Sequence, residues 1–246
     1  MRILSIDWDY FFPCDEGYDW GHQESPFFID ALWSFRVGNK THDGKLILDV
    51  HTPTVPKNFW PKILTNKPHL IVAESHCQIW STLDELRMFG PIDVVNLDAH
   101  HDCGYKKYPR RVPDSFSLDC GDWAFWGRRT HRISQFHQHY PAWRKARPDG
   151  HAAVRPTSTS FELPAADTYN VVFLCRSGAW TPPWYDDQLT GLIKASRLKP
   201  SQVLAPRGLT LQQAREQAKV NETMMRRLSN PEAVIAALEE PTEVTT

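Results

Sequence analysis

Several features are missing from this sequence, and each absence excludes a class of protein. No apolar run approaches the roughly 18 residues that a membrane-spanning helix requires, so we expect no membrane partner. The first residues, MRILSIDWDYFF, lack the charged, apolar and small-residue layout of a signal peptide. A formal net charge of -1 gives the molecule as a whole no electrostatic attraction to nucleic acids. We therefore expect a cytoplasmic protein.

Cysteine is scarce and is poorly placed for cross-linking. The cysteines are odd in number, and no two form the CxxC pair that is typical of zinc ribbons and redox motifs. They are Cys14, Cys77, Cys103, Cys120 and Cys175. We therefore expect free thiols and no disulfide framework. The sequence also shows no internal repeat and no low-complexity tract.

What the sequence does contain is a series of short apolar runs with β-branched residues, which are typical of strands buried in a parallel sheet. The runs cover residues 2–6, 45–50, 69–73, 93–97, 170–174 and 202–204. Helical patterns lie between some of them, at 80–89, where Ser81 and Thr82 can cap the start, and at 186–197. Strands that alternate with helices predict one α/β domain over residues 1–246, a three-layer α/β/α arrangement with a mostly parallel sheet.

Two parts of the chain depart from this alternation. Residues 105–164 are rich in Trp, Arg, His and Pro, so we expect a basic, aromatic-rich insertion of long loops and short helices. Residues 209–240 are predicted to be helical, with an amphipathic helix over 210–228 and a shorter one from Pro231 to Leu238. We expect the amphipathic helix to pack on the sheet, with contact in a homo-oligomer as the alternative.

Clusters of polar residues follow three of the apolar runs. They are Asp7 with Asp9, Glu74 with His76, and Asp98 with His100 and Asp102. The residues of the last cluster are two positions apart, so an extended backbone would point all three to one side. Since parallel strands end at the same edge of a sheet, we expect the three clusters to meet there. Each cluster alone also fits a solvated loop or a helix cap.

Four carboxylates and two imidazoles at one place indicate a metal centre. The carboxylates carry a charge of about -4, which two divalent cations would balance. Mixed carboxylate and imidazole ligands suit Mn²⁺, with Fe²⁺ and Zn²⁺ as alternatives. Cys77 and Cys103 are each one residue out of phase, so we expect core or supporting roles for them. The predicted metal ligands are Asp7, Asp9, His76, Asp98, His100 and Asp102.

These segments resemble the metal-binding motifs of the arginase and agmatinase (ureohydrolase) superfamily. DAHHD at 98–102 matches its DAHxD motif, ESH at 74–76 is similar to its histidine-contributing segment, and SIDWD at 5–9 is similar to its SxDxD segment. VVFLCRSGAW at 171–180 resembles the agmatinase strand that ends in IGIRSG. The DYF that follows SIDW and the LDCGDW at 118–123 are similar to a poorly characterised arginase-like family.

The order of the motifs differs from that of arginases. The SxDxD segment follows the other motifs in arginases, whereas its counterpart opens this chain. Such a circular rearrangement can leave the site unchanged in space, because the termini of compact domains often lie close together. The resemblance implies an arginase-like fold with rearranged motif order and a binuclear metal centre. It covers the sheet and its edge but not residues 105–164.

The resemblance also implies a reaction, the hydrolysis of a C–N bond in a guanidinium, amidine or amide. A metal-bridging hydroxide would attack the carbon, and Asp102 would accept a hydrogen bond from it. We assign proton transfer to His101, and the alternative shuttles are His131, His137 and His139. We assign Glu74 and Arg176 to binding a small-molecule substrate. Arg176 has a second interpretation, in which it pairs with a core carboxylate.

Two other functions stay open from the sequence. Residues 105–147 contain ten Lys or Arg against three Asp, with nine aromatic residues among them, a composition that single-stranded nucleic acid could use. The favoured interpretation of this stretch is a solvated excursion whose aromatic residues form a satellite core. The alternatives to a C–N hydrolase are therefore a metal-dependent enzyme that acts on nucleotides or nucleic acid and a non-catalytic protein stabilised by its metals. The resemblance to arginases also implies a carboxylate that binds the guanidinium, and in the rearranged order Asp49 is the candidate for it.

Overall fold

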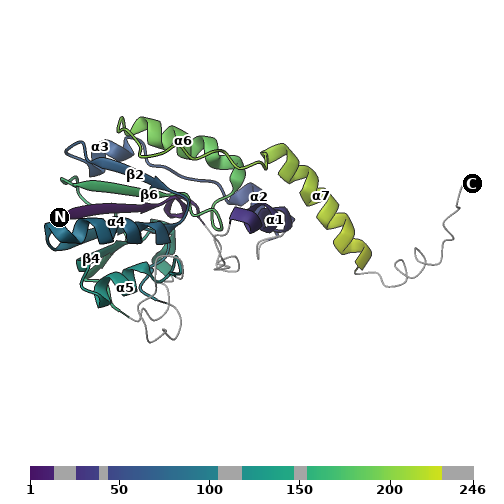
Figure 1. The fold of residues 1–246 in the computed structure, drawn as a ribbon. Coiled ribbons are helices and arrows are strands. Elements are labelled where there is room, and N and C mark those ends of the chain that lie inside the picture. Colours follow the sequence, from purple (N-terminus) through teal and green to yellow (C-terminus); the bar gives the residue numbers. More distant parts are fainter. Residues whose placement is uncertain (14–25, 39–43, 105–117, 147–153, 229–246) are drawn as a thin grey trace, which may run out of the picture.

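The structure is a computed structural model in which residues 1–13, 26–38, 44–104, 118–146 and 154–228 are described (Figure 1). The short helix predicted from Pro231 to Leu238 lies outside these residues. Within the described ranges, no helix is both long and apolar enough to cross a membrane.

A parallel sheet forms the centre of the described structure. Its strands are β1 (Arg2–Asp7), β2 (His69–Ala73), β3 (Ile92–Leu97), β4 (Ile133–His139), β5 (Ser158–Ser160) and β6 (Val171–Cys175). Their order is β2-β6-β1-β3-β4-β5, and each neighbouring pair is parallel. The strand β1 is therefore central, between β6 and β3, and the carboxyl ends of all six strands lie at one edge.

Helices cover both faces of this sheet. The α-helices are α1 (Pro26–Arg36), α2 (Ile47–Val50), α3 (Phe59–Ile63), α4 (Ile79–Leu86), α5 (Trp123–Arg129), α6 (Asp186–Ala195) and α7 (Leu211–Leu228). Short 3-10 helices are η1 (Trp8–Phe11), η3 (His76–Gln78), η4 (Arg87–Phe89), η5 (Ala142–Ala146) and η6 (Pro183–Tyr185). In β1, Ile3 packs in the core with α4 and α5, whereas Leu4 and Ile6 pack in the core with α3 and α6. The two cores give the α/β/α layering of Figure 1.

A third, smaller cluster joins elements beside the sheet. Leu48 of α2 and Val37 pack against Ala214 and Ala218 of α7. The Asn221 side-chain amide also donates to the Ser34 carbonyl, at 2.8 Å. Figure 1 shows α7 projecting away from the sheet beyond α1, so the predicted amphipathic helix packs on other helices and not on the sheet.

The continuous apolar runs are the part of the fold that the sequence predicts best. The runs at 2–6, 69–73, 93–97 and 170–174 form β1, β2, β3 and β6. The helical patterns at 80–89, 186–197 and 210–228 form α4 with η4, α6 and α7. The predicted caps Ser81 and Thr82 are wrong, because Ser75 caps the preceding turn in a capping box with Gln78.

Two predicted strands are not strands. Residues 47–50 form α2, because Leu48 is drawn into the cluster with α7 and the apolar run is too short for periodicity to distinguish a strand from one helical turn. Residues 202–204 run beside β2 without forming a strand. Pro200 and Pro206 bracket this segment and cannot donate backbone hydrogen bonds to a ladder. Ser201 and Gln202 make side-chain and backbone hydrogen bonds to β2 instead.

The segment 105–164 contains more regular structure than we predicted. Its described residues include the short helices α5 and η5, as expected, but also the strands β4 and β5. The sequence ISQFHQH of β4 buries Ile133, Phe136 and Gln138 and has no continuous apolar run. The pattern of continuous apolar residues therefore does not predict β4. The division of residues 1–246 into a core domain with an insertion stays a prediction.

Candidate metal centre

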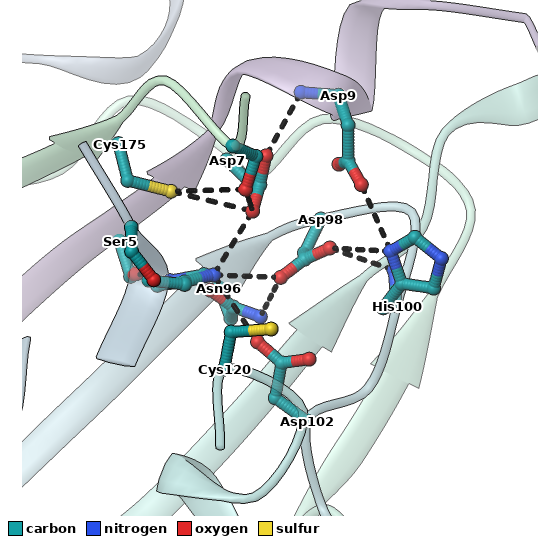
Figure 2. Close-up of polar contacts among 12 residues, drawn as sticks. Ser5, Asp7, Asp9, Asn96, Asp98, His100, Asp102, Cys120 and Cys175 are labelled. Carbon is teal, nitrogen blue, oxygen red and sulfur yellow. Dashed lines mark hydrogen bonds and ion pairs between the residues drawn. The ribbon is translucent and has the colours of Figure 1, made fainter. Parts of the chain in front are cut away.

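The predicted metal ligands converge at the carboxyl edge of the sheet, as expected. Asp7 ends β1, and Asp98 directly follows β3, the neighbouring strand. His76 lies just beyond β2, at the start of η3. Figure 2 shows the side chains of Asp7, Asp9, Asp98, His100 and Asp102 directed toward a common region. All of these aspartates and His76 are buried, and His100 is partly buried.

The backbone that carries these ligand residues is not extended, although their spacing predicted an extended conformation. Asp9 lies in the 3-10 helix η1, where its backbone amide donates to Asp7 Oδ1 at 2.9 Å. Asp102 has a left-handed backbone with φ of 49°. Tight turns after the strands, and not strand alternation, therefore bring these side chains together. Aspartate tolerates the left-handed region better than most residues do.

His76 occupies the inner part of the centre. Its Nδ1 atom lies 3.0 Å from Asp98 Oδ2, 3.1 Å from Asp102 Oδ2 and 3.2 Å from Asp7 Oδ2. Despite these approaches, Nδ1 is buried and makes no hydrogen bond of acceptable geometry within the described structure. A cation bound between these atoms would explain why three carboxylate oxygens lie close to one nitrogen.

Ser5 orients this imidazole from the opposite side. The Ser5 Oγ atom lies 2.6 Å from His76 Nε2, and both side chains are buried. When Nε2–H donates to Ser5, the Nδ1 lone pair faces the three carboxylates. Fixing the tautomer of a metal-binding histidine through its second nitrogen is the usual role of such a partner. Ser5 was not among the predicted site residues, although it is the first residue of the SIDWD segment.

His100 occupies the outer part of the centre. Its Nδ1 atom lies 2.8 Å from Asp9 Oδ2 and 3.7 Å from Asp98 Oδ1. Asp9 Oδ2 is buried and, among the described residues, makes no hydrogen bond of acceptable geometry. The His100 side chain is 14% exposed and its ring lies 5.3 Å from that of Trp180. The other predicted ligands have side chains at most 6% exposed, so solvent reaches the centre from the His100 side.

Hydrogen bonds hold the carboxylates in place. Asp98 accepts from the His100 backbone amide at 2.7 Å and from the Asn96 side chain at 3.3 Å. Asn96 also donates to Gln138 of β4, whose own amide donates to the backbone carbonyls of Asp98 and His100. The loop after β3 is therefore tied to the neighbouring strand β4. Gln138 could not be predicted as part of the site, because β4 was not predicted as a strand.

Asp102 is held by the helix α5. Trp123 donates its indole N–H to Asp102 Oδ2 at 2.5 Å. The backbone amides of Ala124 and Phe125 donate to the Asp102 carbonyl at 3.0 and 3.1 Å. The start of α5 thus fixes both the backbone and the side chain of Asp102. Trp123 belongs to the LDCGDW segment of the sequence, which suggested the family but not this contact.

Asp7 receives hydrogen bonds from the end of β6 and from the loop that follows it. Cys175 donates from its thiol to Asp7 Oδ2 at 3.3 Å, and the Ser177 hydroxyl donates to the same oxygen. Ser177 also has a left-handed backbone, with φ of 47°. Neither residue was predicted to take part in the site. The available signal for Cys175 was its position directly after the apolar run 170–174.

Burial makes several of these carboxylates hard to ionise. Burial raises the pKa of Asp9 well above its usual value, and the charges of Asp7 and Asp98 raise it further. Burial and the charge of Asp98 likewise raise the pKa of Asp102. Asp9 and Asp102 therefore favour the neutral carboxyl form unless a cation compensates their charge.

For His76 and Asp98, charged neighbours outweigh the effect of burial on the pKa. Burial opposes a charge on His76, but Cys175 and the three carboxylates beside its Nδ1 outweigh that effect and raise its pKa well above the usual value. Burial also opposes a charge on Asp98, but His100 and His76 lower its pKa below the usual range. The centre as a whole therefore attracts positive charge.

The ligand atoms form three groups that fit a metal ion. Within each group the ligand atoms lie within 4.8 Å of one another. The groups are Asp9, Asp98 and His100; His76, Asp98 and Asp102; and Asp7, His76 and Cys175. The buried Nδ1 of His76 and the buried Oδ2 of Asp9 face into these groups. The residues present thus fit divalent cations.

The two residues predicted to bind substrate pair with each other. Arg176 donates from Nε to Glu74 Oε2 at 2.7 Å and from Nη1 to Asp186 Oδ2 at 2.8 Å. Arg207 pairs with the same Asp186 carboxylate. This is the ion-pair arrangement that the second interpretation of Arg176 describes. The role of Glu74 and Arg176 in substrate binding stays a prediction, and Asp49 is exposed on α2.

The histidines predicted as proton shuttles differ in their surroundings. His101 is buried, and its Nδ1 accepts from the Cys103 backbone amide at 2.9 Å. Burial and nearby His100 lower the pKa of His101 to about 4. His139 ends β4 at the edge that carries the centre, whereas His131 precedes β4 at the opposite edge. The shuttle role of His101 stays a prediction.

The described part of the basic segment uses its aromatic residues in the core. The buried aromatic residues are Trp123, Phe125, Trp126, Phe136 and Tyr140. Arg132 pairs with Asp84 and lies 4.2 Å from the Trp80 ring. Trp123, Phe125, Trp126 and Phe136 belong to the core that packs against β1, β3 and β6, and not to the satellite core that we expected.

We compared the chain with protein-family models, with curated proteins and with solved structures, and none of the three comparisons gave a match.

Proposed function

We propose that this protein is a binuclear metal-dependent hydrolase of a C–N bond, of the ureohydrolase type with rearranged motif order. The observation that carries the proposal is the convergence of six predicted ligands around two imidazole nitrogens, His76 Nδ1 and His100 Nδ1. The substrate class is a small molecule with a guanidinium, amidine or amide group. Among the described residues, Cys77, Cys103, Cys120 and Cys175 form no disulfide, and reduced thiols are typical of the cytoplasmic location that we propose.

Two ligand sets support a pair of metal ions. The inner position, around His76 Nδ1, would use Asp7, Asp98 and Asp102. The outer position, around His100 Nδ1, would use Asp9 and Asp98. Asp98 places Oδ2 near the inner histidine and Oδ1 near the outer one, so it would bridge the positions. Carboxylate and imidazole ligands suit Mn²⁺, with Fe²⁺ or Zn²⁺ as alternatives.

The protein's own residues would position the substrate and move protons. A bound pair of divalent cations lowers the pKa of water, so a nucleophile is available near neutral pH. Asp102, whose Oδ2 is held by Trp123, would accept a hydrogen bond from that nucleophile. The substrate would enter beside His100 and Trp180, the more exposed side. His101 or another histidine at this edge would return a proton to the leaving amine.

Elemental analysis is the first test of this proposal. Protein purified without chelator from manganese-supplemented medium should contain about two metal ions per chain. Asp7→Ala and Asp98→Ala should lose one or both ions, because each removes a carboxylate from a buried cluster. The matched control is Asp93→Ala, which removes a β3 carboxylate that bonds Ser134 away from the centre. It should keep the full metal content.

Activity is then tested on guanidines, amidines and amides by measuring released urea or amine. Turnover that is lost in Asp98→Ala and kept in Asp93→Ala would support the proposal. Full metal content without turnover on any of these compounds would favour the non-catalytic alternative. A metal ratio near zero would overturn the centre itself, and salt-dependent binding to single-stranded DNA would then be measured for the basic segment.

A further inference from the structure

Cys175 lies in the centre, and the resemblance to ureohydrolases gives it no role there. It is the last residue of β6 and is fully buried. The β-sheet register pairs it with Asp7 of β1 on one side and with Ala73 of β2 on the other. Figure 2 shows its thiol directed at the Asp7 carboxylate, and the Sγ to Oδ2 distance is 3.3 Å.

A second residue independently points to a ligand at this place. His76 Nδ1 is buried, lies 3.2 Å from the same Asp7 oxygen and makes no hydrogen bond of acceptable geometry within the described structure. Its other nitrogen is taken by Ser5. The sulfur of Cys175, the Nδ1 of His76 and a carboxylate oxygen of Asp7 all lie within 4.8 Å of one another.

These separations suit a tetrahedral zinc site. Zinc bonds of about 2.3 Å to sulfur and about 2.0–2.1 Å to nitrogen and oxygen place neighbouring ligand atoms about 3.3–3.6 Å apart. The measured distances from Asp7 Oδ2 are 3.2 Å to His76 Nδ1 and 3.3 Å to Cys175 Sγ. These two distances lie within a few tenths of an ångström of the expected spacing, and the Sγ to Nδ1 distance is at most 4.8 Å.

We infer that Cys175 is a metal ligand, so that the inner position is a sulfur-containing zinc site and the outer position is the manganese site. This inference rests on the proposed binuclear centre and names the metal at each position. Thiolate with imidazole favours Zn²⁺ over Mn²⁺, whereas the outer ligands, Asp9, Asp98 and His100, are oxygen and nitrogen alone. Zinc binding would form the Zn–S bond and release the thiol proton to solvent.

A different role for Cys175 makes a different prediction. If it only donates a hydrogen bond to Asp7, sulfur never enters the coordination sphere. X-ray absorption spectroscopy at the zinc edge on the full-length protein separates the two roles without any mutation. We expect a sulfur scatterer at about 2.3 Å beside nitrogen and oxygen at about 2.0–2.1 Å. A zinc shell of nitrogen and oxygen alone would overturn the inference.

Cobalt substitution assigns the sulfur to a residue. Co²⁺ bound by a thiolate has a near-ultraviolet charge-transfer band, which we expect in the unmodified protein and not in Cys175→Ser. Matched controls are Cys103→Ser, which is also buried, and Cys120→Ser, whose thiol Figure 2 also draws near the centre. Both should keep the band. Loss of the band in Cys120→Ser and not in Cys175→Ser would overturn the assignment.

Metal competition provides a readout that does not depend on turnover. Cys175→Ser should lower the preference for Zn²⁺ over Mn²⁺ at least about tenfold, as expected when a soft ligand is lost. Circular dichroism checks that the variant is folded. A sulfur-ligated centre without C–N hydrolysis would leave this inference standing and overturn the proposed function. C–N hydrolysis by a centre without a sulfur ligand would support the proposed function and overturn this inference. A chain that binds no metal would overturn the inference and the proposed function.

Discussion

Two residues at the centre adopt a backbone conformation that non-glycine residues rarely take. Asp102 and Ser177 have φ angles of 49° and 47°. Each such residue costs on the order of 1 kcal/mol or more, and such residues cluster at functional sites. In both residues the side chain points into the centre. Asp102 Oδ2 lies close to His76 Nδ1, and the Ser177 hydroxyl donates a hydrogen bond to Asp7. The local strain thus accompanies the placement of groups around the proposed metal ions.

The contact between Ser5 and His76 yields a prediction at this scale. Ser5→Ala removes the Oγ atom that lies 2.6 Å from His76 Nε2, so the imidazole loses a contact that fixes its tautomer and orientation. Loss of such a supporting contact typically lowers metal affinity about 10–100-fold. The measurement is competition for Mn²⁺ or Zn²⁺ against a chelator of known affinity.

The control for Ser5→Ala is Ser134→Ala. Ser134 Oγ also makes short hydrogen bonds, to the Ile92 carbonyl and to Asp93, but at the edge of the sheet opposite the centre. This variant should keep its metal affinity. Equal affinities in the two variants would show that Ser5 does not support the ligand.

His51 gives a prediction about pH. It is buried, its ring lies 5.2 Å from that of Phe12, and its Nε2 is 2.9 Å from the Trp180 carbonyl. Burial lowers its pKa from 6.5 to about 4. Between these values the unfolded chain binds a proton that the folded protein does not. His51 therefore makes the folded state less stable as pH falls from 6.5 to 4, by up to about 3 kcal/mol.

The measurement is urea unfolding of the unmodified protein and of His51→Gln at several values across that pH range. The glutamine amide can still donate toward the Trp180 carbonyl but does not titrate. The free energy of unfolding of His51→Gln should therefore fall less steeply toward pH 4. Identical pH profiles for the two proteins would contradict the assignment.

At the scale of elements, glycine in α5 provides a sharp test of packing. A Cβ atom added at Gly127 would lie 2.9 Å from Ile133 Cγ1 and still closer to its Cδ1. Ile133 is buried on β4 and cannot move away freely. Gly127→Ala gains about 1 kcal/mol of helix propensity. We expect the overpacking cost of about 1–3 kcal/mol to exceed that gain and lower the free energy of unfolding.

Gly191 in α6 is the matched control, because nothing lies within 4 Å of an added Cβ atom there. Gly191→Ala should therefore stabilise the protein by roughly 0.5–1 kcal/mol, the propensity gain alone. Chemical denaturation of both variants measures the difference. A stabilised Gly127→Ala would show that α5 and β4 are less tightly packed than the structure has them.

Elements with a strong local pattern could be predicted from the sequence, and the others could not. The strands β1, β2, β3 and β6 are apolar runs because helices cover both of their faces. The strand β4 carries His137 and Gln138 and lies toward the edge, beside the short β5, so its composition resembles a loop. Tertiary packing decides such segments, and a single sequence does not contain that information explicitly.

The same distinction applies to the centre. Aspartate and histidine after buried strands were predictable, because charged groups there need a partner. Ser5, Trp123 and Cys175 were not singled out, because serine, tryptophan and cysteine are common inside proteins and gain a special role only from their neighbours. The turns at Asp9 and Asp102 were also missed, since spacing alone suggests an extended chain.

At the scale of the whole molecule, metal should act as a stabiliser. The proposed ligands come from segments after β1, β2 and β3, so bound ions would connect strands that are distant in sequence. An ion present at 100 times its dissociation constant adds about 2.7 kcal/mol to the stability of the folded state. Chelator should therefore lower the midpoint of thermal unfolding, and added Mn²⁺ or Zn²⁺ should restore it.

Asp98→Ala provides the control for this effect, because Asp98 faces both imidazoles. Its thermal midpoint should respond less to metal than that of the unmodified protein, whereas that of Asp93→Ala should respond as in the unmodified protein. A chelator-insensitive midpoint in the unmodified protein would contradict a stabilising metal centre.

The central position of β1 has a consequence for the newly made chain. Its carboxylates are synthesised early, but the thiol of Cys175 that contacts Asp7 follows 168 residues later. The two strands that flank β1, β3 and β6, also follow it along the chain. Asp7 and Asp9 are therefore synthesised before most of the residues that surround them in the fold. The proposed ions would bind tightly only after β6 has paired with β1.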